Sequence, residues 1–99
     1  MDAFKKQPYE TFVVGADFSK VLKNDETITD TNATALDKNG AVASESVIDN
    51  SSISEADGIM SVRVQAGEES LSPYKLTFRI ISSAANKYEL DVKMYVREL

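Results

Sequence analysis

The chain has 99 residues, 42% of them hydrophobic, which suits one globular domain with a single core. It contains no His and no Cys, which excludes the usual general base at neutral pH, disulfides, thiolate chemistry and most zinc, copper and iron sites. The net charge is −5, and between residues 24 and 57 the only base is Lys38 against eight acids, so we expect no nucleic acid partner.

The first eight residues (1–8) predict an N-terminal arm, and residues 9–99 predict a single β-sandwich domain. The arm is polar, and arms of this kind order on contact, so Phe4 is a candidate to pack on a neighbouring protein. The start lacks the apolar run of a signal peptide, and no stretch approaches the roughly 20 apolar residues of a membrane span. We therefore expect no membrane partner, and the absence of Cys fits a cytosolic origin.

Residues 9–36 predict two strands separated by one helical turn. Residues 9–14 are rich in β-branched and aromatic side chains and stop at Gly15. The apolar spacing after Asp17 fits one helical turn, which Asp17 would cap and which would plug the open end of a sandwich. A strand is expected over 27–36, with a bulge or a break because its apolar spacing is irregular.

The middle of the chain predicts a tight turn, weak strands and a loop. Asn and Gly are adjacent in the turn at 37–40, and both readily take the positive φ angles of hairpin turns. Short strands are expected at 41–43 and 46–48, and a surface loop is expected over 49–58. Residues 59–66 alternate apolar and polar side chains, which indicates a half-buried strand.

Residues 73–99 predict a long antiparallel hairpin, around which the rest of the chain is organised. Large apolar side chains occupy every second position of both strands, and successive side chains of a strand point to opposite faces. The loop at 82–87 lacks large apolar and β-branched residues. Tyr74 is a candidate tyrosine corner, whose hydroxyl would bond the preceding connection; an ordinary tyrosine at the edge of the core is the alternative.

These elements predict an all-β fold. About seven short strands with turns roughly every 8 to 12 residues favour an antiparallel β-sandwich of immunoglobulin or fibronectin type. An up-and-down barrel and an oligosaccharide-binding barrel are the alternatives. The only helix that the pattern predicts is a single turn.

The side chains available for chemistry are carboxylates, Lys, Tyr, Ser and Thr. Paired carboxylates hydrolyse glycosides across a cleft for which so small a sandwich has little room, so we expect no enzymatic activity. The four Gly are isolated and form no phosphate-binding loop. No cofactor is expected. Calcium is the one metal to weigh, with solvated acids as the commoner explanation, because four oxygen donors lie near one loop: Asp49, Asn50, Glu55 and Asp57.

Three apolar residues fall on the face of the hairpin opposite its buried ladder, namely Ile81, Tyr95 and Leu99. Apolar residues exposed singly are ordinary, whereas a group on one sheet would form a subunit contact. Together with Phe4 they are the candidate interaction residues, and no residue is assigned to catalysis or to a metal. The free edges of a sandwich offer strand addition as a second mode of contact.

Short motifs are spread along most of the chain. The turn Asp17-Phe18-Ser19 precedes an apolar pair, an acidic turn and Thr27-Ile28, and Gly67 precedes a strand over 74–78 and a last strand that closes on Val96-Arg97-Glu98. This pattern resembles small structural proteins of tailed bacteriophages and prophages, of the fibre-tail adaptor kind. Where such proteins have a Gly-Asp turn, this chain has Asn24-Asp25.

The resemblance implies an immunoglobulin-like virion component that is made in the cytoplasm of a bacterial host. It implies binding to neighbouring tail, neck or capsid proteins during assembly, without catalysis, and a homo-oligomer or a ring as the assembled form. A carbohydrate-binding or adhesion module is the alternative. Such modules normally stack exposed aromatic side chains on sugar rings, and this chain has no Trp and four Tyr.

Overall fold

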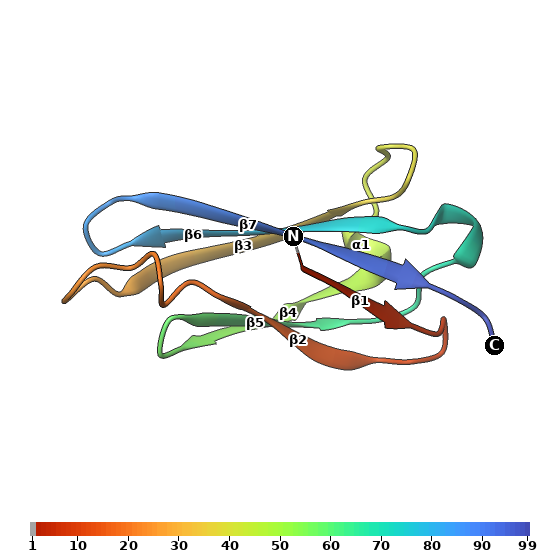
Figure 1. Cartoon of the computed structure of the whole chain (residues 1–99), viewed down its shortest axis with the longest axis horizontal. Coiled ribbons are helices and arrows are strands. Elements are labelled where there is room, and N and C mark those ends of the chain that lie inside the picture. The colour runs from red at the N-terminus through yellow and green to blue at the C-terminus, as the bar shows by residue number, and fades with distance from the viewer. Residues whose placement is uncertain (1) are drawn as a thin grey trace.

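The computed structural model describes residues 2–99, which form seven strands in two facing sheets (Figure 1). The strands are β1 (Asp2–Lys6), β2 (Phe12–Asp17), β3 (Ile28–Leu36), β4 (Ile48–Ala56), β5 (Ile59–Val64), β6 (Tyr74–Ser82) and β7 (Lys87–Val96), with one helical turn α1 (Ser44–Val47) and one 3-10 turn η1 (Glu69–Leu71). One sheet has the order β1-β7-β6-β3 and the other the order β2-β5-β4. The predicted all-β sandwich is confirmed.

The predicted hairpin is present as β6 and β7. Their register runs from Tyr74 opposite Met94 to Ile81 opposite Lys87. Every second residue of β6 faces the other sheet and is buried. The inward residues of β7 become more exposed toward the loop, where the Leu90 side chain is 37% exposed. The alternation of apolar residues therefore placed both strands and their inner faces.

The core lies between the sheets. β5 supplies Met60, Val62 and Val64, all fully buried, as the alternation over 59–66 predicts. Phe18 is also fully buried, in a turn where its carbonyl accepts the N–H groups of Val21 and Leu22. The Asp17 carboxylate accepts the Ser19 N–H in the same turn at 2.8 Å. Burying a large apolar side chain stabilises a fold by about 1.5–3 kcal/mol, so this plug contributes as much as a core strand residue.

Two further predictions about local structure are confirmed. The register of β3 against β6 shifts between Ile28 and Asp30, where an irregularity was expected. The turn after β3 closes with the Asp37 N–H donating to the Ala41 carbonyl at 2.9 Å, and Gly40 takes a φ of 82°.

The prediction of short strands at 41–43 and 46–48 is wrong. Val42 forms only an isolated bridge with Leu36, and the chain then folds into α1, which buries Val47. The Ser44 hydroxyl accepts the Ala35 N–H at 2.9 Å, so this segment covers the end of β3 instead of forming a strand of its own.

The prediction of a surface loop over 49–58 is also wrong, because most of these residues belong to strand β4. β4 pairs with β5 at both ends, and its register is interrupted between Asp49 and Ser54. It is an outer strand of the sheet with few buried side chains, so its composition is that of a loop although its backbone is paired. Likewise, the first expected strand begins at Phe12 and ends at Asp17, later than predicted.

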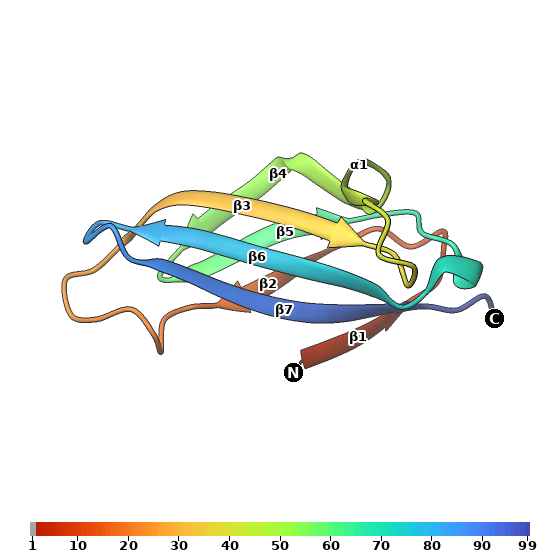
Figure 2. The same cartoon turned by 90° about the horizontal axis from the view of Figure 1, so that it is seen from above.

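The N-terminal arm requires a correction. Residues 2–6 form β1, which pairs in parallel with β7 and lies at the edge of that sheet (Figure 2). The reason is local packing: Lys6 is 2% exposed, and the ring of Phe4 meets that of Phe12 edge-on at a centroid distance of 5.9 Å. Met1, the remaining part of the predicted arm before β1, lies outside the described residues, and a domain made of residues 9–99 alone stays a prediction.

The order β2-β5-β4 and the order β7-β6-β3 are those of strands B-E-D and G-F-C in the immunoglobulin arrangement. In that arrangement strand A pairs with strand B, whereas β1 pairs with β7 here. Within residues 2–99 the position beside β2 is therefore empty. Assignment to the immunoglobulin class stays a prediction.

Candidate functional site

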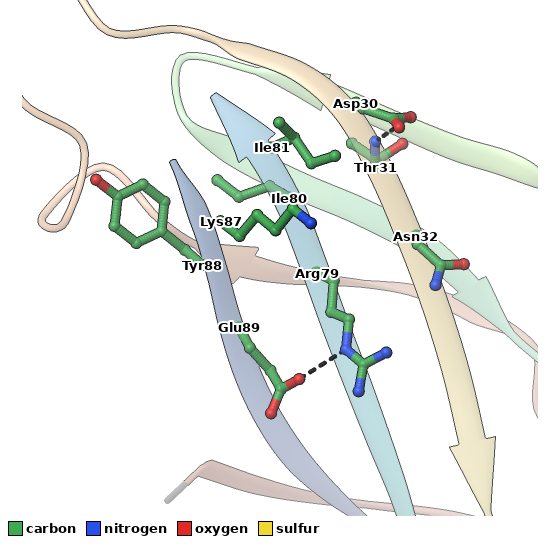
Figure 3. A pocket seen from close by; sticks show the side chains of 9 residues that line it. All are labelled: Asp30, Thr31, Asn32, Arg79, Ile80, Ile81, Lys87, Tyr88 and Glu89. Atoms are coloured by element: carbon green, nitrogen blue, oxygen red, sulfur yellow. Dashed lines mark hydrogen bonds and ion pairs between the residues drawn. The ribbon is translucent and has the colours of Figure 1, made fainter. Parts of the chain in front are cut away.

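A hollow of about 700 Å³ lies on the outer face of β3, β6 and β7 (Figure 3). Asn32 of β3 stands opposite Arg79 of β6, which stands opposite Glu89 of β7, so the side chains of one row cross three strands. We call this surface the hairpin groove; its lining residues are Asp30, Thr31, Asn32, Arg79, Ile80, Ile81, Lys87, Tyr88 and Glu89.

The hairpin groove combines balanced charge with apolar surface. The Nε of Arg79 donates to Oε1 of Glu89 at 2.6 Å, and these side chains are 58% and 49% exposed (Figure 3). Exposed ion pairs contribute only about 0.2–1 kcal/mol, so both groups are available to a binding partner. Lys87 and Asp30 add one charge of each sign, and Ile81 is half-buried between them. Such a surface suits contact with another protein.

One end of the hairpin groove is held by the carboxylate of Glu26. It accepts hydrogen bonds from the Lys23 N–H at 2.8 Å, the Asn86 side-chain amide at 3.0 Å and the Tyr88 hydroxyl at 3.3 Å. The Ser82 hydroxyl also donates to it. We call these five residues the Glu26 clasp. It ties the connection between β2 and β3 to the loop of the hairpin.

The clasp keeps Glu26 ionised. The Lys23 N–H and then the Ser82 hydroxyl lower the pKa of Glu26 from its usual 4.5 to about 2. Two further hydrogen bonds reinforce the same junction: the Ser83 N–H donates to the Thr27 carbonyl at 2.7 Å, and the Thr27 N–H donates to the Ser83 hydroxyl at 3.0 Å. The loop beside the groove is thus fixed by bonds on both sides.

The buried amine of Lys6 holds the opposite end of the molecule. It donates to the carbonyls of Gln7 at 2.7 Å, Pro8 at 3.3 Å and Ala66. Burial lowers the pKa of Lys6, and the charge of Glu10 opposes this by raising it. We call this arrangement the Lys6 anchor, because it fastens the end of β1 to the segment that follows β5.

The four candidate interaction residues do not form one patch. Phe4 packs inside its own chain, and Leu99, 95% exposed, lies beyond the end of β7. Ile81 stands opposite Lys87 at the loop end of the hairpin, whereas Tyr95 lies eight positions further along β7, roughly 26 Å away. Of the four, Ile81 alone lines the hairpin groove; Leu99 lines a second hollow of about 450 Å³ near Lys5 and Arg97.

The oxygen donors considered for calcium are not gathered into a site. Asp49, Asn50 and Glu55 lie along β4, and Asp57 lies in the turn after it. One carboxylate oxygen of Asp49 already accepts the N–H and the hydroxyl of Ser51, at 3.1 and 2.6 Å. In the part of the chain that the structure describes, no group of three or more His, Cys, Asp or Glu is placed to hold a metal ion.

Sequence reasoning missed the Glu26 clasp and the Lys6 anchor. Both depend on contacts between residues about 60 positions apart, for which the local pattern carries no signal. Sequence reasoning also missed the open edge of β2. That edge is open because β1 pairs with β7 and not with β2, and the sequence does not show this pairing. Among residues 2–99, no helix has the length and apolar character that crossing a membrane requires.

A protein family covers most of this chain. A family model described as "Podophage GP4 fiber-tail adaptor protein gp77" matches residues 6–96, which include β2 to β7 and only the last residue of β1. A search of curated proteins found no match. The family match confirms the resemblance seen in the sequence motifs. Because it covers most of the chain, the protein belongs to the podophage fibre-tail adaptor family.

Proposed function

We propose that this chain is a non-catalytic module that joins a fibre protein to the tail of a phage through protein contacts. The family match over residues 6–96 carries the proposal, since it makes the chain a structural component of the phage tail. The lack of His and Cys supports a role without catalysis. The binding partners are other virion proteins, and the chain reaches them after synthesis in the cytoplasm of the bacterial host.

The hairpin groove is the surface that we assign to one of these partners. Its mixed charges and the half-buried Ile81 resemble the polar rim and apolar centre of protein interfaces. The Glu26 clasp fixes the adjoining loop, so a partner meets a shape that is already formed. A preformed surface loses little conformational entropy on binding, which suits a module that stays in place in an assembled particle.

The test is to mix the purified chain with the purified tail and fibre proteins of the same phage. Size-exclusion chromatography with light scattering should then give a co-eluting complex of defined mass. The same measurement on the chain alone tests the homo-oligomer or ring that we expect in the assembled form. A chain that co-elutes with neither protein would overturn the adaptor role.

A pair of charge reversals tests the groove itself. Arg79→Glu should weaken binding about ten-fold or more, because it breaks the pair with Glu89 and places two acids side by side. Lys38→Glu changes the net charge by the same amount in the exposed turn after β3, and it should leave binding unchanged. Equal effects of the two variants would show that total charge, and not the groove, governs binding.

A further inference from the structure

The outer edge of β2 presents unpaired backbone groups. The Phe18 N–H donates to the Gly58 carbonyl at 2.8 Å, on the side of β5. Hydrogen bonding alternates along an antiparallel pair, so every second residue counted back from Phe18 faces β5. Val13, Gly15 and Asp17 therefore direct their N–H and C=O groups to the other side, where no strand lies within residues 2–99.

The side chains along this edge are mainly apolar. Val13 is 56% exposed and Ile59, one strand further in, is 41% exposed. A Cβ at Gly15 would lie 3.2 Å from Cγ2 of Ile59, so the glycine lets the isoleucine lie across β2. The base nearest to Val13 across the strand pair is Arg63 of β5. On its other side Arg63 stands opposite an acid, Asp49 of β4. No residue of β2 before Asp17 is charged.

The edge of β3, by contrast, is blocked near both of its ends. The Thr31 N–H donates to the Asp30 carboxylate at 2.9 Å, and the Ala35 N–H donates to the Ser44 hydroxyl at 2.9 Å. The Ala35 carbonyl accepts the Ala43 N–H at 2.9 Å as well. These bonds take three backbone groups that a continuous incoming strand would need.

The other two edges are protected in different ways. β4 loses its regular register between Asp49 and Ser54, where the Ser52 hydroxyl accepts the Arg63 N–H at 2.7 Å. β1 has only five residues and carries an exposed lysine, Lys5, on its outer edge. Bulges, short strands and edge lysines are the devices that keep sheet edges from pairing. Among the four edges of the described sandwich, β2 has none of them: its register is continuous from Phe12 to Asp17.

Acidic groups mark both ends of this open edge. Glu10 is exposed just before β2, and Asp17 is exposed at its end. Hydrogen bonds from the Ser19 side chain and backbone lower the pKa of Asp17, and nearby Lys20 lowers it further, so the carboxylate is ionised near neutral pH. Asp57, in the turn between β4 and β5, adds a second acid at this end. The whole chain carries a charge of −5.

We propose that the free edge of β2 is a strand-addition site for an extended segment of a partner protein, with an uncharged, alternating apolar centre and a Lys or Arg at each end. Three N–H and three C=O groups select an extended backbone, because only a strand offers matching groups at that spacing. The acids at the two ends select basic flanks, and the net negative charge disfavours a second copy of this chain as the occupant. The site goes beyond the adaptor role, which the hairpin groove supports separately.

The experiment uses a synthetic peptide, so its outcome does not depend on tail or fibre proteins. The probe is a capped heptapeptide of sequence Lys-Val-Thr-Val-Thr-Val-Lys, and its control replaces both Lys by Glu. Amide hydrogen exchange followed by NMR should slow about ten-fold or more at Val13, Gly15 and Asp17 when the basic peptide saturates the protein. The acidic peptide should bind about ten-fold more weakly.

Two valine substitutions separate the edge from general charge effects. Val13→Lys places a lysine on the open edge and should weaken peptide binding about ten-fold or more. Val42→Lys makes the same change at a valine that is 80% exposed and is bridged to Leu36 of the other sheet, and it should bind like the unmodified chain. Val13→Pro removes one of the edge N–H donors without adding charge and should also weaken binding.

Three results would overturn the proposal. The first is an absence of protection at these amides at millimolar basic peptide. The second is protection that Val13→Lys leaves unchanged. The third is protection that rises with protein concentration without peptide, because the edge would then pair with a second copy. Since none of these involves the tail or fibre proteins, a failure here leaves the adaptor role standing.

Discussion

The hydroxyl of Tyr74 accepts the backbone N–H of Glu68 at 2.9 Å, across the connection that leads from β5 into β6. The ring of Tyr74 is buried at the start of β6, and its polar end reaches back over Gly67. This is the geometry of a tyrosine corner. Of the two roles considered for Tyr74 from the sequence, the corner is confirmed.

Replacing this tyrosine by phenylalanine should destabilise the fold. Tyr74→Phe keeps the buried ring and leaves the Glu68 N–H without its partner, so the free energy of unfolding in urea should fall by about 1 kcal/mol. Tyr95→Phe is the matched control, because Tyr95 is 36% exposed and should tolerate the change. Equal effects of the two substitutions would mean that the corner contributes nothing of its own.

Glu26 should make the thermal stability of the fold depend on pH in the acid range. Folding lowers the pKa of this carboxyl from 4.5 to about 2, so its contribution is complete above pH 4.5 and is lost as the pH falls toward 2. The melting temperature of the unmodified chain should therefore fall more steeply over that range than the melting temperature of Glu26→Gln. Glu45→Gln, at an exposed position in α1, should follow the unmodified chain. Parallel curves for all three proteins would contradict this account of the clasp.

The Lys6 anchor should hold β1 in the sheet. Lys6→Met retains the length of the side chain but leaves the carbonyls of Gln7, Pro8 and Ala66 without their donor, at a cost of about 1–3 kcal/mol of stability. Lys5→Met, at the exposed neighbouring position, should cost far less.

Hydrogen exchange locates the effect of this substitution. The Arg97 N–H donates to the Lys6 carbonyl at 3.0 Å, so it should exchange faster in Lys6→Met than in the unmodified chain. A variant that loses stability with no faster exchange at Arg97 would show that the anchor supports the core rather than β1.

Two glycines with the same backbone angle should respond differently to alanine. Gly40 and Gly58 have φ values of 82° and 83°, so alanine is strained at both. At Gly40 the added methyl group meets nothing within 4 Å, whereas at Gly58 it would lie 3.1 Å from the Cα of Ser19. Gly40→Ala should cost about 1 kcal/mol and Gly58→Ala clearly more, measured by urea unfolding. The reverse order would contradict the close approach of the turn before β5 to the Phe18 plug.

The sequence was sufficient where one face of a strand is buried. Alternation placed β5, β6 and β7, because a period of two is visible whenever apolar and polar faces differ. It failed at β4, an outer strand that buries only Ile48 completely and therefore looks like a loop. There the pairing with β5 overrides a composition of Ser, Asn and Asp.

The candidate site was predictable only in part. Ile81 was assigned to the outer face of the hairpin, and it does line the groove there. The partners that complete this surface, Asp30 and Asn32, lie in β3, some 50 residues away, and their register across β6 follows from the folded sheet. Lys6 fell within the predicted polar arm at residues 1–8, because lysines are seldom buried, and nothing near it in sequence identifies Ala66 as an acceptor.

The parallel pairing of β1 with β7 has a mechanical consequence. Asp2 lies at the start of one strand, and Val96 lies at the end of the other, opposite Lys6. Tension applied to the two ends of the chain therefore pulls these strands in opposite directions along their length. The hydrogen bonds between Asp2–Lys6 and their five partner residues are then loaded together in shear instead of opening one after another. The sheet edge that bears this load is the one that the buried amine of Lys6 fastens.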